Sequence, residues 1–179
     1  MYIQAVDDIH VTADIRTTEF QTYNAPHTLV NSEVNFVNSG SLISFHSNII
    51  SPGTMYIDGD SLFPEGFTSH IIEQFGSAGD FEVNGDIIGE VLLSSNSTIS
   101  GSGYISSAKI DEPGVQIRPN PVSSGGLTIS TLLLNHDISM SFALVNYLNY
   151  SRILFEEVQN IGGNNIEFIV TEDNQVGMG

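Results

Sequence analysis

The chain has 179 residues, of which 21 are acidic and 4 basic, giving a formal net charge of −17 at pH 7. This charge argues against nucleic-acid binding, which needs clustered lysine and arginine, and against binding to an anionic membrane surface. Because the chain has no cysteine, it forms neither disulfides nor thiolate metal sites, and no run approaches the ~18 apolar residues of a membrane span.

Composition predicts a single all-β domain over residues 1–179. Hydrophobic residues make up 40% of the chain, which is enough for a core, whereas charged residues make up only 14%. The polar surface is therefore mostly serine, threonine, asparagine and glycine, a composition that suits strands with many turns better than exposed helices. The first residues, MYIQAVDDIH, show no signal-peptide pattern. Strand-like sequence directly after Met1 is typical of a segment of a longer protein.

Apolar pairs at positions i and i+2 recur along the chain and predict its main strands. In chain order they are Ile9/Val11, Val34/Phe36, Met55/Ile57, Phe81/Val83, Gly103/Ile105 (where Tyr104 shares the apolar role), Leu127/Ile129 and Ile153/Phe155. The mean spacing of about 24 residues between pairs fits one coil of a parallel β-helix holding two or three short strands. We therefore expect a parallel β-helix of about seven coils.

Two dipeptides keep an antiparallel β-sandwich open as the alternative fold. Asp58-Gly59 and Asn84-Gly85 are typical hairpin turns, and sandwich strands also recur every ~8–12 residues. The stretch Thr68–Phe75 fits either a short helix inserted between coils or a bulged strand.

The stretch from Thr98 to Ile129 predicts scaffold rather than a reactive site. Its apolar pairs are each ended by Gly, Ser, Asn or Pro, which indicates strands of a few residues joined by tight corners. We place corners at Pro113-Gly114 and at Pro119–Gly126. Further along, Asn146–Arg152 is predicted to be a protruding loop.

The strongest candidate for a metal site is Asp58 with Asp60. Alternate carboxylates lie on one side of an extended chain, and calcium takes several oxygen ligands, so a calcium site is the one cofactor hypothesis that the sequence supports. The competing interpretation is a pair of solvated turn residues. The EF-hand loop and the glycine-rich calcium nonapeptide are both absent from the sequence.

Three residues are candidates for ligand binding: Arg118, Tyr147 and Tyr150. The tyrosines fall in the predicted protruding loop, where an aromatic ring could stack on a ligand. Arg118 is the one basic residue near clustered carboxylates, Asp111 and Glu112, which is the pairing that a polysaccharide lyase would need. No P-loop, serine nucleophile elbow or dinucleotide fingerprint is present, so we assign no catalytic residue.

Several short motifs resemble the repeats of filamentous-haemagglutinin-like adhesins and the ends of autotransporter passengers. They are Gln21-Thr22-Tyr23-Asn24, Ser39-Gly40, Ser51-Pro52-Gly53, Ile99-Ser100-Gly101-Ser102-Gly103, Leu127-Thr128-Ile129, Gly162-Gly163-Asn164 and Ile166-Glu167-Phe168. Such families are right-handed parallel β-helices secreted to a bacterial surface. The resemblance therefore implies surface display, with a glycan or protein on a host or neighbouring cell as partner.

We expect a non-catalytic structural or adhesive segment of a secreted cell-surface protein. Exposed strand edges at the ends of a β-helix invite pairing, so irregular end segments or self-association through the ends are also expected. Two alternatives remain: a tailspike-type β-helix that degrades polysaccharide, and a β-sandwich binding module that uses calcium.

Overall fold

The computed structural model describes residues 1–31, 33–71, 75–122, 126–144 and 150–172. These residues form strands and turns, without helix. The strands are β1 (Tyr2–Gln4), β2 (Ile9–Val11), β3 (Ile15–Thr17), β4 (Gln21–Val30), β5 (Val34–Ser51), β6 (Met55–Phe63), β7 (Thr68–Ile71), β8 (Phe75–Ala78), β9 (Asp80–Val83), β10 (Asp86–Leu93), β11 (Thr98–Gly101), β12 (Tyr104–Ile110), β13 (Gln116–Pro119), β14 (Pro121–Val122), β15 (Leu127–Leu134), β16 (Ile138–Leu144), β17 (Tyr150–Ser151), β18 (Ile153–Asn160) and β19 (Ile166–Glu172). No helix in the described ranges could therefore cross a membrane.

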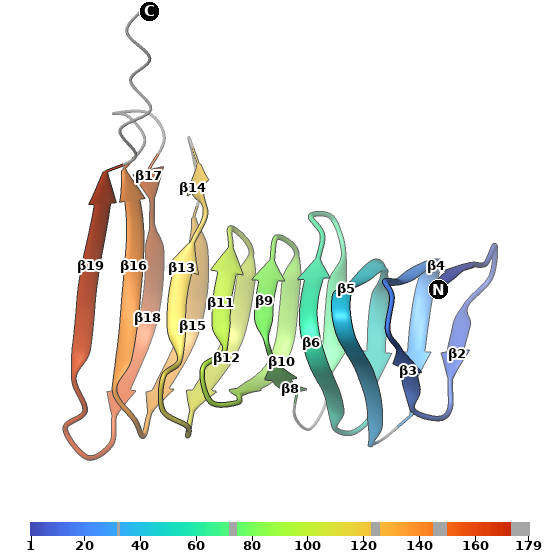
Figure 1. Ribbon diagram of the computed structural model, residues 1–179, viewed down its shortest axis with the longest axis horizontal. Coiled ribbons are helices and arrows are strands. Elements are labelled where there is room, and N and C mark those ends of the chain that lie inside the picture. The colour runs from blue at the N-terminus through green and yellow to red at the C-terminus, as the bar shows by residue number, and fades with distance from the viewer. Residues whose placement is uncertain (32, 72–74, 123–125, 145–149, 173–179) are drawn as a thin grey trace, which may run out of the picture.

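The chain winds as a parallel β-helix, and Figure 1 shows its strands stacked from the N-terminal to the C-terminal end. Each strand pairs in parallel with strands of the preceding and following coils. On the face that we call A the stack runs β1, β4, β5, β6, β9, β11, β13, β16 and β19. In the described residues the antiparallel pairings are those of β17 with β14 and with β16. The parallel β-helix is confirmed, and the antiparallel sandwich is excluded.

Two further faces complete each coil. Face B stacks β2, the end of β4, the end of β5, β7 and the first parts of β10, β12, β15 and β18. Face C stacks β3, the first parts of β5 and β6, then β8 and the last parts of β10, β12, β15 and β18. Long strands such as β5 turn corners without losing their pairing, because neighbouring coils turn with them.

The predicted spacing of about 24 residues holds only near the C-terminal end. Phe81 pairs with Ile99 and Ile99 with Ile117, so these coils advance by 18 residues. From Ile105 to Ile129 and on to Phe155 the steps are 24 and 26 residues. The prediction averaged over apolar pairs that belong to different faces, since Ile57 lies on face C and Val83 on face A.

An aromatic stack fills the core of the N-terminal half. The rings of Tyr23, Phe45 and Phe63 lie one above another on face A, with successive centroids 5.1 and 5.3 Å apart. Phe36 meets the first two rings edge-on at 5.4 and 5.3 Å. In-register parallel pairing places each ring directly over the next, and each buried aromatic side chain stabilises the fold by roughly 1.5–3 kcal/mol.

Buried polar groups beside this stack are hydrogen-bonded to one another. The Tyr23 hydroxyl donates to Oε1 of Gln21 at 2.9 Å. The amide of Gln21 donates to Thr17 Oγ1 at 3.1 Å and to the Val37 carbonyl at 2.9 Å. Burial raises the pKa of Tyr23 far above its ordinary value of 10.0. The aromatic core therefore continues past a fully buried glutamine without leaving its amide unpaired.

The two predicted hairpin turns are corners between faces. Gly59 has φ +134°, and a Cβ there would stand 2.5 Å from the carbonyl oxygen of Asn38 in the preceding coil. Asn84 accepts a hydrogen bond from the backbone N–H of Ser102 in the next coil at 3.2 Å. Asp-Gly and Asn-Gly bend the chain equally well in both settings. Here the following strand continues around the coil and pairs with neighbouring coils instead of folding back.

The predicted helix-or-strand stretch begins as a strand. Residues Thr68–Ile71 form β7, which pairs with β5 on one side and β10 on the other. Phe75 begins β8, and residues 72–74 lie outside the described residues. The helical alternative is therefore wrong for the first half of the stretch, where alternate side chains point into the core.

The hydroxyl of Ser61 is a buried group without a hydrogen-bond partner in the described part of the chain. Ser61 lies on face A between Ile43 and Phe81, both fully buried. We predict that Ser61→Ala raises the free energy of unfolding by about 1 kcal/mol, because it removes an unsatisfied polar group. Urea unfolding followed by circular dichroism measures this change.

Ser47→Ala is the matched control for that substitution. Ser47 is equally buried, but its hydroxyl bonds to Thr28 Oγ1 at 2.7 Å. This variant should lose about 1–3 kcal/mol, since the Thr28 hydroxyl is left unpaired. Equal destabilisation by both variants would contradict the assignment of Ser61 as an unpaired group.

Candidate functional site

The predicted metal ligands Asp58 and Asp60 lie on either side of the Gly59 corner. Asp58 ends the face C part of β6 and Asp60 begins the face A part, and both are exposed. Oδ1 of Asp60 accepts the backbone N–H of Asp80 at 3.0 Å, so this carboxylate joins two coils. Within the described ranges no cluster of three or more His, Cys, Asp or Glu is placed to hold a metal ion. Calcium binding here stays a prediction.

Other carboxylates also join successive coils, with asparagine as partner. Asp14 accepts the backbone N–H of Asn35 at 2.9 Å and its side-chain amide at 3.0 Å. Asp137 holds Asn165 in the same way, at 2.7 and 3.2 Å. These bonds stabilise the charged form and so lower the pKa of both carboxyls. Part of the acidic composition therefore holds corners together.

The predicted grouping of Arg118 with Asp111 and Glu112 does not form. Asp111 lies at the end of face C, where it contacts Nζ of Lys109 at 2.7 Å and accepts a bond from Asn135. The Lys109 ammonium, more than any other group, lowers the pKa of Asp111. Glu112 accepts a bond from Ser95 at 3.1 Å. Arg118 is on β13, on face A, so the residues of the postulated lyase site lie on different elements.

Arg118 instead lies beside the predicted protruding loop. Oγ of Ser151 donates to the carbonyl of Pro119 at 2.7 Å, and it accepts the backbone N–H of Ala143 at 3.1 Å. The short strands β14 and β17 pair antiparallel at this point, beyond the end of the main coils (Figure 1). We call Arg118–Val122 with Tyr150–Arg152 the Ser151 corner.

The Ser151 corner brings together two of the three predicted ligand-binding residues. Arg118 is exposed and points outward between Ser100 and the next coil. Tyr150 lies in β17, opposite Val122, whereas Tyr147 lies outside the described residues. Sequence reasoning treated Pro119–Gly126 as a plain corner and missed its pairing with β17. Two-residue strands give no periodic signal that could have revealed it.

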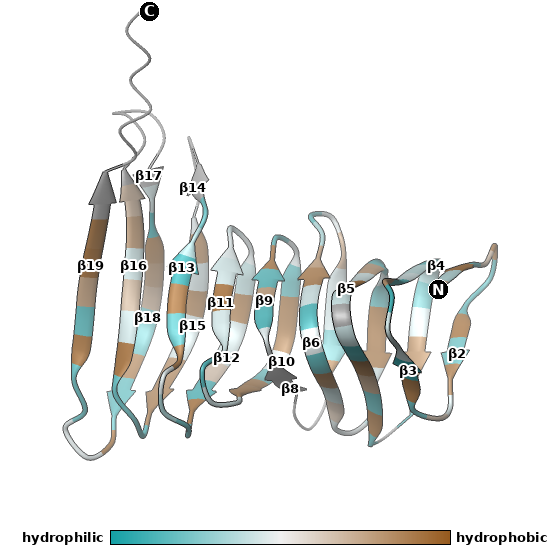
Figure 2. Ribbon diagram, in the orientation of Figure 1, coloured by the Kyte–Doolittle hydropathy of each residue, from teal (hydrophilic) through white to brown (hydrophobic). Residues whose placement is uncertain are grey.

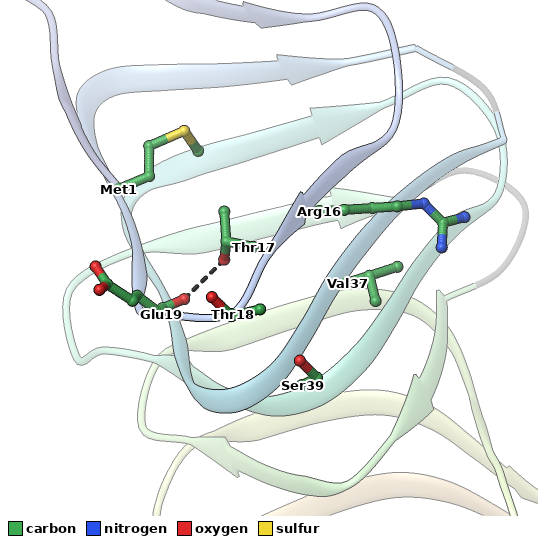
Figure 3. Close-up of a pocket in the computed structure, with 7 residues that line it drawn as sticks. All are labelled: Met1, Arg16, Thr17, Thr18, Glu19, Val37 and Ser39. Atoms are coloured by element: carbon green, nitrogen blue, oxygen red, sulfur yellow. Dashed lines mark hydrogen bonds between the residues drawn. The ribbon is translucent and has the colours of Figure 1, made fainter.

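Sequence reasoning also missed a groove of about 510 Å³ near the N-terminal end. It is lined by Met1, Arg16, Thr17, Thr18, Glu19, Val37 and Ser39, as Figure 3 shows. The Thr17 hydroxyl donates to the Glu19 carbonyl at 2.7 Å, which holds the turn that closes one side. Arg16 extends away from this turn and lies 3.6 Å from Asp14. The groove arises from the fit between the first two coils, which no local motif encodes.

A comparable groove of about 530 Å³ lies where β13, β16 and β19 begin. Gln116, Ser139 and Glu167 line it on successive coils, and the Asp137–Asn165 pair borders it. Both grooves are shallow channels between coils, with no converging set of acid and base groups among the described residues that line them.

Comparison with known proteins returns no relative: no family model, curated protein or solved structure matches the chain.

The Asp137–Asn165 pair predicts how stability varies with pH. Because the pKa of Asp137 lies below its ordinary value of 3.8, its contribution is present above that value and is lost as the pH falls through the lowered pKa. Asp137→Asn should therefore be less stable than wild type at pH 7. The difference should shrink as the pH falls below about 3.8, which urea unfolding across a pH series measures.

Asp7→Asn is the control for this experiment. Asp7 is exposed and makes no hydrogen bond or ion pair in the part of the chain that the structure describes. Its substitution should leave the stability at pH 7 unchanged. A constant difference between Asp137→Asn and wild type at every pH would contradict a stabilising role for the Asp137 charge.

Proposed function

We propose that the chain is a non-catalytic structural and adhesive segment of a secreted bacterial cell-surface protein. The observation that supports this proposal is the unbroken parallel ladder on all three faces, from β1 to β19. Each coil is held to the next by backbone hydrogen bonds and by a continuous core, an arrangement that makes an extended and stiff support.

The ladder would act mechanically, by holding exposed corners away from the cell. Outward positions on its faces carry mostly Ser, Thr, Asn and acidic side chains, while inward positions are apolar. The net charge of −17 keeps such a segment soluble and discourages close approach to an anionic surface. These properties suit a spacer or stalk that is displayed outside the cell.

The Ser151 corner is the part of the segment best suited to recognise a partner. Arg118 and Arg152, two of the four basic residues, lie on either side of the Ser151–Pro119 hydrogen bond. Arginine pairs well with carboxylate and sulfate groups because its guanidinium presents several donors in one plane. We therefore propose an acidic glycan of a host or neighbouring cell, or a protein carrying one, as the ligand.

Glycan binding by the Ser151 corner can be tested on an array of sialylated, sulfated and neutral glycans. We expect the wild-type chain to bind the acidic glycans, and Arg118→Ala to bind them about 10-fold more weakly, because a charged hydrogen bond is lost. Arg16→Ala, near the N-terminal groove, should bind like wild type. Equal binding by Arg118→Ala and wild type, or no binding by either, would reject this corner as the adhesive site.

The same glycans provide the test against an enzyme. Incubation with the wild-type chain should leave their length unchanged, as measured by size-exclusion chromatography. Shortening that disappears in the Asp58→Asn, Asp60→Asn, Asp111→Asn, Glu112→Gln variant would overturn the non-catalytic proposal in favour of a polysaccharide-degrading β-helix.

A further inference from the structure

The C-terminal end exposes the inner side of its last coil. Phe168 pairs with Met140 and Val158 with Leu132, so both occupy inward positions of the stack. Met140 and Leu132 are buried, at 1% and 0% exposure, whereas Phe168 and Val158 are 65% and 43% exposed. Val170, opposite Phe142, is 68% exposed. These side chains continue the core but have no described layer above them.

Further apolar side chains extend this surface. Leu154, Ile161 and Ile169 are 59%, 59% and 38% exposed on the same two strands and the turn between them. Figure 2 shows hydrophobic bands along β19 at this end of the molecule. We call Leu154, Val158, Ile161 and Phe168–Val170 the terminal apolar surface. Contiguous exposed apolar surface of this kind marks an interaction site.

The backbone of the last coil is also available for pairing. Among the described residues β18 pairs only with β15, and β19 only with β16. Their other edges present backbone N–H and C=O groups in rows of 8 and 7 residues. An apolar surface bordered by free strand edges is suited to another β-structure, which can satisfy both at once.

The N-terminal end is closed by comparison. The inward residues Ile9 and Val11 of the first coil are only 7% and 4% exposed. Met1, Ile3, Ala5 and Ile15 pack against the same core and leave little of it open. The strands β1, β2 and β3 are 3 residues each, so they match neither the length of β18 nor that of β19. A head-to-tail contact would therefore join two ends that differ in length and in apolar surface.

We propose that the terminal apolar surface binds a second copy of this chain through its own equivalent surface. In such a two-fold contact β19 faces β19 of the other copy, so strand lengths and apolar positions match by symmetry. The contact buries both open ends and leaves no further copy of this surface exposed, so assembly stops at a dimer. This inference does not rest on the adhesive function.

Charge sets the conditions under which the dimer forms. Glu156, Glu157 and Glu167 lie on the same two strands, and their approach to the same residues of a second copy is repulsive. Salt screens such exposed charges, with a Debye length of about 10 Å at 0.1 M. The dimer should therefore be favoured by added sodium chloride, in contrast to a contact made by opposite charges.

Sedimentation equilibrium of the 179-residue chain across a concentration series tests the proposal. We expect a monomer–dimer equilibrium without larger species, and a tighter dimer at 0.5 M than at 0.05 M sodium chloride. Phe168→Asp should weaken the dimer at least about 100-fold, because the charge enters a symmetric contact twice. Since the Phe168 side chain is mostly exposed, the variant should fold, and its circular dichroism spectrum checks this.

Two further variants make the test decisive. Val170→Asp should also dissociate the dimer, and it serves if Phe168→Asp proves unfolded. Val6→Asp alters a side chain that is 94% exposed near the N-terminal end and should dimerise like wild type. A strictly monomeric wild-type chain, a mass that rises beyond the dimer, or dissociation by Val6→Asp would each overturn the proposal, the last two in favour of head-to-tail assembly.

Discussion

The structure depends on the in-register stacking of parallel coils. A residue that points inward on one coil is covered by the residue at the same place in the coils before and after it. Tyr23, Phe45 and Phe63 form such a column, and Phe81, Ile99 and Ile117 form another. No coil could bury its own apolar side chains, because a single turn of chain has no opposite layer. The core is therefore a property of the stack.

Polar side chains at the corners follow the same rule. Asp14, Asp60 and Asp137 each bond to a backbone N–H in the following coil, and Asn84 does the same to Ser102. A corner leaves backbone groups without a ladder partner, and these short side chains supply the missing acceptor. The excess of carboxylates thus serves two purposes, since some hold the coils together and the others keep the surface soluble.

Much of the fold could be predicted from the sequence, because alternation of apolar residues and turn chemistry are local signals. The pairs Phe81/Val83 and Leu127/Ile129 are inward residues of strands, as expected. The face on which each pair lies could not be predicted, since faces A, B and C share the same alternation. Asp58-Gly59 shows the same limit: its chemistry favours a bend, and only the stack decides between a hairpin and a corner. For the candidate site, the sequence indicated Arg118 and Tyr150, but their shared corner follows from contacts between residues 32 positions apart.

The column of stacked coils also has a consequence for how the molecule comes apart. An inner coil has two neighbours, and to remove it both must separate, whereas the coil formed by β18 and β19 has one described neighbour and the least buried side chains. Heat or a pulling force should therefore peel the chain from its C-terminal end, one coil at a time, and reach the aromatic column last. The molecule would then lose length in steps while its N-terminal half stays folded.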